Sequence, residues 1–253
     1  MPRLLDASIN RYRGCWVSTE LPADSSTFHT DLAHSLALWQ ADGIKVVWLT
    51  LNSARAALIP IAVTHGFDFH HVAGDAVILT KRLQSGAIIP EFANHTIGVG
   101  GIVFNARGEI LVVIEQHDKH TRPGHWKFPG GAVDKGELIR EAAIREVKEE
   151  TGIIATFDQL VGLRHYHYGQ FGTSNIYALC RLHAVNNTIT PCPEEIFASK
   201  WISPEDYLAC DTVIEFNKAL LRAALYHHGM PTLEVGDLHG IAPAEYELFA
   251  AAR

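Results

Sequence analysis

The sequence between residues 127 and 153 is a glycine-rich stretch that leads directly into an acidic helix, and it constrains the fold more than any other segment. The helix is expected from about Leu138 to Thr151, and Gly152 ends it. At about 100° per residue, three glutamates share one face of this helix: Glu146, Glu149 and Glu150. The opposite face carries Ile144, Val147 and Thr151. One side of the helix is therefore expected to pack on a sheet, while the other presents three carboxylates.

The three carboxylates need a counter-charge, because like charges three and four residues apart destabilise a bare helix by roughly a few tenths of a kcal/mol per pair. Clustered carboxylate oxygens are the ligands that Mg²⁺ or Mn²⁺ prefers. Such an ion can bind phosphate oxygens and lower the pKa of a bound water. We therefore predict a divalent metal site on the three glutamates of the helix: Glu146, Glu149 and Glu150.

The remaining positions of the segment have roles that fit such a site. Gly130 and Gly131 permit backbone conformations and a close approach that a Cβ would prevent. Arg145 lies inside the acidic helix and can hold a neighbouring carboxylate in position, with Glu141, four residues earlier, as one candidate partner. Glu137 stands at the helix entrance, where the helix dipole favours negative charge.

A run of glutamates is by itself typical of a solvated helix face, but the complete pattern is more specific. The segment resembles the Nudix box, G-x5-E-x7-R-E-U-x-E-E-x-G-U, in which U is an aliphatic residue. Every specified position matches: Gly131, Glu137, Arg145, Glu146, Val147, Glu149, Glu150, Gly152 and Ile153. The resemblance implies a Mg²⁺ or Mn²⁺ site on the helix glutamates, with Gly130 of the preceding loop as a further ligand. It also implies hydrolysis of a nucleoside diphosphate linked to another group X. ADP-ribose, NADH and coenzyme A are the usual candidate substrates.

The resemblance also suggests catalytic roles for Glu149, Arg145 and Glu195. A further glutamate on a loop outside the box often joins the metal site or acts as the base, and Glu195 is the best match, with its neighbour Glu194 as the alternative. The base should be a carboxylate near the metal with a pKa tuned by its neighbours, and we place Glu149 first and Glu195 second. Arg164 is a candidate for binding the pyrophosphate, with a structural salt bridge as its alternative role.

The likeness extends over nearly the whole chain. Residues 126–131 resemble the loop that precedes the box in this family. Residues 95–101 resemble the opening strand of a Nudix subgroup that carries an extra N-terminal pre-Nudix domain. This subgroup includes many plant Nudix hydrolases and the animal antisense basic fibroblast growth factor protein. Residues 11–14 and 66–71 resemble signatures of the pre-Nudix domain. By the same resemblance we expect a homodimer.

We predict two α/β domains. A small acetyltransferase-like pre-Nudix domain covers residues 1–90, and a Nudix α/β/α sandwich with a C-terminal helical extension covers residues 91–253, with turn-forming residues at the join 84–95. In the first domain, the apolar spacing predicts helices at 24–41 and 53–64 and strands at 14–18, 45–49 and 77–80. In the second, it predicts strands at 96–104, 110–115, 153–168 and 174–183 and helices at 138–151, 204–210 and 213–228.

The N-terminal domain departs from a working acetyltransferase at one position. Such an enzyme needs a pyrophosphate-binding loop of the form R/Q-x-x-G-x-G/A. Here Arg11 and Gly14 match this loop, whereas Trp16 places a bulky indole where a small residue is required. We therefore interpret the domain as a dimerisation or substrate-shaping module and not as a second enzyme.

Composition limits the partners and the compartment. The chain has 253 residues, of which 47% are hydrophobic, and a formal net charge of −7. An acidic protein is poorly suited to hold nucleic acid by counterion release, so we expect a small nucleoside diphosphate derivative and no nucleic acid. No segment approaches the roughly 18 apolar residues of a membrane span, and the N-terminus has no signal-peptide core, so we expect no membrane association and a cytoplasmic location. The cysteines lack metal-binding spacing and are expected to be reduced thiols: Cys15, Cys180, Cys192 and Cys210.

A non-catalytic nucleotide-sensing module of the same fold is the alternative function. A module of that kind has usually lost one or more metal ligands, whereas Glu146, Glu149 and Glu150 are all present, so the sequence favours the hydrolase. Cleavage of capped RNA ends is a third possibility, and the acidic net charge and the lack of a basic patch argue against it.

Overall fold

The structure is a computed structural model that describes residues 1–234, 236 and 240–251. The chain divides into two compact units, Met1–Ala93 and Asn94–Arg253. The sequence places the boundary between them within the segment 84–95. Each unit has its own five-stranded sheet and is described separately.

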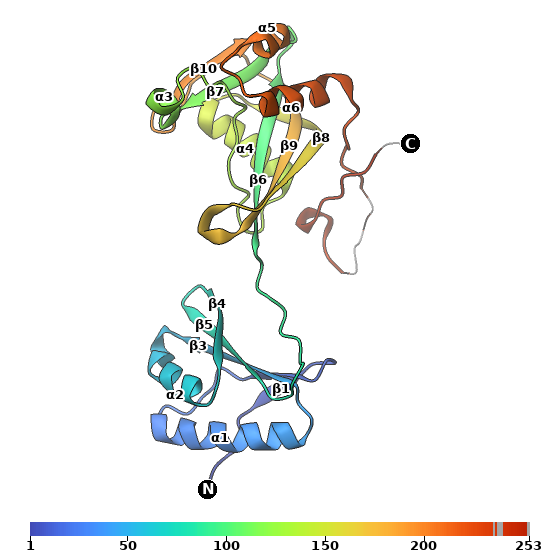
Figure 1. Cartoon of the computed structure of the whole chain (residues 1–253). Coiled ribbons are helices and arrows are strands. Elements are labelled where there is room, and N and C mark those ends of the chain that lie inside the picture. The colour runs from blue at the N-terminus through green and yellow to red at the C-terminus, as the bar shows by residue number, and fades with distance from the viewer. Residues whose placement is uncertain (235, 237–239, 252–253) are drawn as a thin grey trace. The chain divides into compact units, whose positions relative to one another are not determined.

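The N-terminal unit is a five-stranded sheet with helices on one face (Figure 1). The strand order is β1-β2-β3-β5-β4, and only the β2–β3 pair is parallel. The strands are β1 (Ala7–Ile9), β2 (Gly14–Val17), β3 (Val46–Asn52), β4 (Asp68–Ala73) and β5 (Ala76–Arg82). The helices are α1 (Ser25–Ala41), the 3-10 helix η1 (Ser53–Leu58) and α2 (Ile59–Thr64).

Strand alternation gives this sheet two different faces. The inward residues of β2, β3 and β5 form one core with α1, which contributes Phe28, Leu32, Leu36 and Trp39. On the other face, Val46, Trp48 and Ile78 form a small separate cluster, on which Ala87 and Ile89 of the following segment pack. No helix of the unit shares that second cluster.

The C-terminal unit is a mixed sheet of order β10-β7-β6-β9-β8, in which β6 and β9 run parallel. Its strands are β6 (His95–Phe104), β7 (Ile110–Glu115), β8 (Ala155–Tyr166), β9 (Ser174–Ala184) and β10 (Ile196–Ile202). Its helices are α3 (Asp118–Thr121), α4 (Ile139–Thr151), η2 (Gln170–Gly172), α5 (Pro204–Ala209), α6 (Glu215–Tyr226) and η3 (Pro243–Glu245).

Helices cover both faces of this sheet (Figure 1). On one face, Ala142, Ala143 and Val147 of α4 pack on inward residues of β6, β8 and β9. On the other face, Tyr207 of α5 and Leu221 of α6 share a core with the opposite side of β6 and β7. The unit is therefore a three-layer α/β/α sandwich, which confirms the predicted fold class. The acetyltransferase-like character of the N-terminal unit stays a prediction.

Most predicted elements occur within two residues of their expected ends, and the differences have local causes. The predicted helix 53–64 is divided into η1 and α2, because Pro60 lies in the first turn of a new helix. The cysteines are free, and Cys15 and Cys180 are buried. Among the residues that the structure describes, no helix is both long and apolar enough to cross a membrane.

Candidate active site

Helix α4 presents the acidic residues from a rigid position on the sheet. Ala142, Ala143 and Val147 are fully buried against the strands, which fixes the rotation of the helix. Gly152 ends the helix with a left-handed φ of 70°, where a Cβ would be costly, and its amide donates to the Lys148 carbonyl. The polar side of the helix therefore faces the preceding loop.

Arg145 organises that polar side with all five of its N–H donors. Its Nε and Nη2 form a two-pronged pair with the Glu137 carboxylate at 2.7 and 2.9 Å. Nη1 donates to Glu146 Oε1 at 2.9 Å and to Glu149 Oε2 at 3.0 Å. The second Nη2 hydrogen reaches the Ala132 carbonyl at 3.0 Å. The guanidinium therefore joins the loop to three carboxylates, and it holds the pKa of Glu137 below its usual value.

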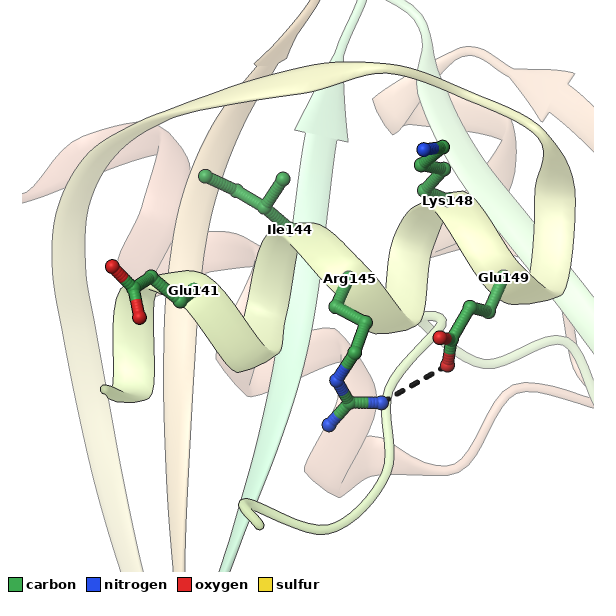
Figure 2. Close-up of a pocket in the computed structure, with 5 residues that line it drawn as sticks. All are labelled: Glu141, Ile144, Arg145, Lys148 and Glu149. Atoms are coloured by element: carbon green, nitrogen blue, oxygen red, sulfur yellow. Dashed lines mark hydrogen bonds and ion pairs between the residues drawn. The ribbon is translucent and has the colours of Figure 1, made fainter. Parts of the chain in front are cut away.

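This network corrects the expected partner of Arg145. The sequence offers Glu141, one turn earlier, but Glu137 takes the paired position and no donor of Arg145 is left over. Figure 2 shows Glu141 on the same exposed side of α4, away from the guanidinium, while Arg145 reaches Glu149. The helical spacing alone favours Glu141, because it cannot describe how the loop before the helix folds back.

The glycine loop lies directly against strand β6 and beneath Glu146. The Gly131 carbonyl accepts from the Val99 amide at 2.8 Å, and the Pro129 carbonyl accepts from the Gly101 amide at 2.9 Å. A Cβ on Gly131 would lie 2.6 Å from the Glu146 carboxylate carbon. A Cβ on Gly130 would lie 2.1 Å from the Val99 carbonyl oxygen. Both glycines are therefore required by close approach, as predicted.

Glu150 is the buried member of the acidic set. Its side chain accepts from the Gly130 amide at 3.2 Å, and the residue is only 4% exposed. Burial raises the pKa of Glu150 to about 8, although the nearby Lys127 charge and the Gly130 amide act in the opposite direction. Burial likewise raises the pKa of Glu146, and Arg145 partly counters it. A cation beside these carboxylates would favour their charged forms.

The remaining glutamates sit at different depths. The Glu149 side chain is 57% exposed and lines a shallow pocket of about 430 Å³ with Glu141, Ile144, Arg145 and Lys148 (Figure 2). Ile144 was predicted on the opposite face. It is half-buried and packs against the core beneath the helix, as predicted, and it also lines this pocket. Glu150, by contrast, faces inward, because the packed stripe of the helix is wider than an angular estimate suggests.

Glu195 lies close enough to Glu146 for its charge to raise the pKa of that residue. The loop before β10 brings it there. The Cys192 amide donates to the Glu150 carbonyl at 3.0 Å, and the Gln116 amide donates to the Glu195 carbonyl at 2.7 Å. The Glu195 charge thus acts on the acidic helix.

Sequence comparisons bear on this arrangement. The sequence profile described as NUDIX domain matches residues 94–224, and one described as Nudix hydrolase domain matches residues 5–83. The chain belongs to the Nudix hydrolase family. It is 36% identical to Nudix hydrolase 2 of Arabidopsis thaliana over 81% of this chain and 74% of the relative. It is 33% identical to nucleoside diphosphate-linked moiety X motif 6 of Homo sapiens over 80% of this chain and 65% of the relative. The predicted subgroup of Nudix proteins is therefore confirmed.

Arg164, outside the Nudix box, lies among aromatic rings. Its guanidinium carbon is 5.0 Å from the centre of the Tyr177 ring and 5.7 Å from that of Phe216, and Nη2 donates to Asn175 Oδ1 at 2.9 Å. Within the described residues, no carboxylate forms an ion pair with Arg164. The alternative role, a structural salt bridge, is therefore not observed. Its Nε is buried without a hydrogen-bond partner.

Tyr177 connects Arg164 to the Nudix box. Burial raises the pKa of the Tyr177 hydroxyl; the Glu150 charge raises it further and the Arg164 charge lowers it, so Tyr177 lies within reach of both. Its hydroxyl occupies the space above Gly100, where a Cβ would lie 2.0 Å away. The sequence analysis missed this residue. The glycines of β6 are the signal that a large side chain crosses that strand.

A second acidic group beside the Nudix box was also missed. Among the described residues, Glu115, His117 and Asp118 are the set whose ligand atoms all lie within 4.8 Å of one another. Glu146, Glu149 and Glu150 do not meet that spacing, because Arg145 holds two of them and Glu150 turns inward. Glu115 pairs with Lys127, and its charge raises the pKa of Glu150. Its position at the end of β7 could have indicated it.

Proposed function

We propose that this Nudix hydrolase cleaves the pyrophosphate bond of a nucleoside diphosphate linked to a group X, with Mg²⁺ or Mn²⁺ as cofactor. ADP-ribose, NADH and coenzyme A are the candidate substrates. The observation that carries the proposal is the Arg145 network, which holds Glu137, Glu146 and Glu149 and the glycine loop next to the buried Glu150. On an ordinary solvated helix face, water would solvate the carboxylates, and no such network would be needed to hold them.

The residues fit a hard divalent cation. Glu146 and Glu150 are carboxylates whose pKa values are raised by burial, and a cation offsets that cost. With Glu149 and Gly130 they are the proposed ligands, all of them oxygen donors of the kind that Mg²⁺ and Mn²⁺ select. When bound, the ion supplies positive charge to the pyrophosphate and acidity to a water.

The chain's own side chains supply the proton chemistry and the positioning. Glu149 is proposed to accept a proton from the attacking water, because its carboxylate is exposed and its orientation is set by Arg145. Glu195 is the second candidate for this step. Arg164 is proposed to contact the substrate, because its charge lies near Tyr177 and, within the described residues, no carboxylate is paired with it.

The test measures turnover of ADP-ribose, NADH, coenzyme A and a capped dinucleotide with Mg²⁺ and with Mn²⁺. We expect one of the first three to be hydrolysed, and Glu149→Gln to lower kcat by roughly a hundredfold or more. Glu141→Gln is the matched control, because Glu141 lines the same pocket but is not bonded to Arg145. Binding of a compound without turnover in any condition would instead support a non-catalytic nucleotide sensor.

A further inference from the structure

The helix-free face of the N-terminal sheet carries a cavity of about 890 Å³. This volume lies within the range of small-molecule pockets. Every residue that lines the cavity belongs to the N-terminal unit. The cavity is therefore separate from the Nudix box, and its capacity to bind a ligand does not depend on the proposed hydrolase activity.

Aromatic rings that line the cavity form a continuous series of contacts. Trp16 stacks on Trp48 with ring centres 4.6 Å apart and planes inclined by 9°. Trp48 contacts His70 edge-on at 4.8 Å, and His70 contacts His71 at 4.9 Å. His71 then stacks on Phe92 at 4.1 Å. Although Trp48 is buried, Trp16 remains 40% exposed, so an indole surface is available to a planar ligand.

The walls of the cavity are fixed by contacts within the unit. On one side, the Asn10 side chain accepts from the amides of Tyr12 and Gly14, both at 2.9 Å, and Arg13 takes a left-handed φ of 64°. A non-glycine residue in that region costs free energy, so the loop conformation is held by its surroundings. On the other side, the Pro90 carbonyl contacts His70 Nε2 at 2.7 Å. The cavity is thus formed before any ligand binds.

The charge at the rim is positive. Three cationic side chains line the cavity, Arg11, Arg13 and Lys45, against one carboxylate, Glu91. In the part of the chain that the structure describes, none of these three cations is ion-paired: Arg13 Nη2 donates to the Asp42 carbonyl, and the Arg11 guanidinium lies 4.7 Å from the centre of the Tyr12 ring. In a protein with a formal net charge of −7, an unpaired cationic group over exposed aromatic rings is matched to an anionic aromatic ligand.

We propose that this cavity binds a nucleoside monophosphate, with its base on the Trp16 indole and its phosphate among Arg11, Arg13 and Lys45. A base provides the flat surface that stacks on an exposed indole. A phosphate dianion balances several cations, which a single carboxylate would not, and arginine binds it through paired N–H groups. The N-terminal unit then acts as a second nucleotide site.

Calorimetric titration of the full-length protein with AMP, in the presence of a chelator, tests the proposal. We expect AMP to bind, and adenosine or inorganic phosphate alone to bind at least roughly tenfold more weakly. Arg11→Ala and Trp16→Ala should each weaken AMP binding roughly tenfold, while Arg11→Lys restores part of it. Arg3→Ala and Phe69→Ala are the matched controls, because both residues belong to the same unit and lie outside the cavity lining.

Three binding results would overturn the proposal. The first is no AMP binding at millimolar concentration, and the second is binding that Arg11→Ala leaves unchanged. Arg11 is exposed on a loop, so its substitution does not threaten the fold even where Trp16→Ala does. The third is loss of AMP binding in Glu149→Gln, which would place the nucleotide at the Nudix box. Sedimentation of the same variants tests a different occupant of this face. If the protein is a dimer and Trp16→Ala dissociates it, a second copy of the chain covers the cavity, and the proposal is overturned.

Discussion

At the scale of single residues, the Arg145 network makes a prediction about geometry. Its planar fork serves three carboxylates and a carbonyl, and a lysine ammonium cannot reproduce that pattern. We expect Arg145→Lys to lower kcat/KM by roughly a hundredfold, because small displacements of catalytic groups are costly. The same exchange at Arg140, on the same helix, should leave kcat/KM near the wild-type value. Equal losses of kcat/KM in Arg145→Lys and Arg140→Lys would contradict this prediction, because they would show a general effect of substitutions on this helix.

Glu150 makes a residue-scale prediction about pH. Its pKa is raised from 4.5 to about 8 in the folded protein, so folding is favoured by its protonation. This contribution is complete below the unfolded pKa and is lost as the pH rises through the folded pKa. Glu150→Gln stays neutral at every pH. In chelator, the free energy of unfolding of this variant should therefore rise relative to that of the wild type as the pH increases from 4.5 to about 8. The gain is several kcal/mol, since each pKa unit is worth about 1.4 kcal/mol.

Urea denaturation at several pH values measures this difference. Glu141→Gln is the control, because Glu141 is exposed on the same helix and should shift the unfolding free energy equally at every pH. If the difference between Glu150→Gln and the wild type were constant with pH, Glu150 would be charged in the folded protein throughout. That result would also remove the argument that burial prepares this carboxylate for a cation.

The sequence indicated which residues belong to the candidate site, but not most of the contacts between them. The positions of the Nudix box are readable because metal and backbone chemistry restrict each to one residue type. The sequence did not indicate which carboxylate pairs with Arg145, because Glu137 reaches the guanidinium only when the loop folds back over the helix. Tyr177 and Glu115 come from strands distant in sequence, and only the sheet pairing brings them to Glu150.

At the scale of elements, we expect the two glycines of the loop before α4 to differ: substitution of one should lower stability and substitution of the other should lower activity. Gly130→Ala would place a Cβ 2.1 Å from a backbone oxygen of β6, so we expect a loss of roughly 2 kcal/mol or more in unfolding free energy. Gly131→Ala would meet the movable Glu146 carboxylate, so turnover should fall much more than stability. Gly162→Ala, which meets nothing within 4 Å, is the control for both assays. Equal stability losses at 130 and 131 would contradict this division.

Element prediction succeeded where the apolar period is clear and failed at edges. The limits of β7 were predicted as observed, because the strand is a short, continuous apolar run bounded by polar residues. Helix α4 begins only one residue later than expected, because its apolar residues recur at helical spacing. Strand β4 was missed because it is an edge strand with four exposed residues and two half-buried histidines. Strand β1, three exposed residues long, was missed for the same reason.

At the scale of the whole molecule, separate cores predict separate unfolding. Leu49 is fully buried in the core of the N-terminal unit, and Leu111 is fully buried in that of the C-terminal unit. We expect two calorimetric transitions, with Leu49→Ala lowering one and Leu111→Ala the other, since a buried leucine truncation costs about 2–5 kcal/mol. Mg²⁺ should raise only the transition that Leu111→Ala lowers, because a ligand stabilises the unit that binds it. AMP should raise only the other. A single transition moved by both substitutions would mean that the two units unfold as one.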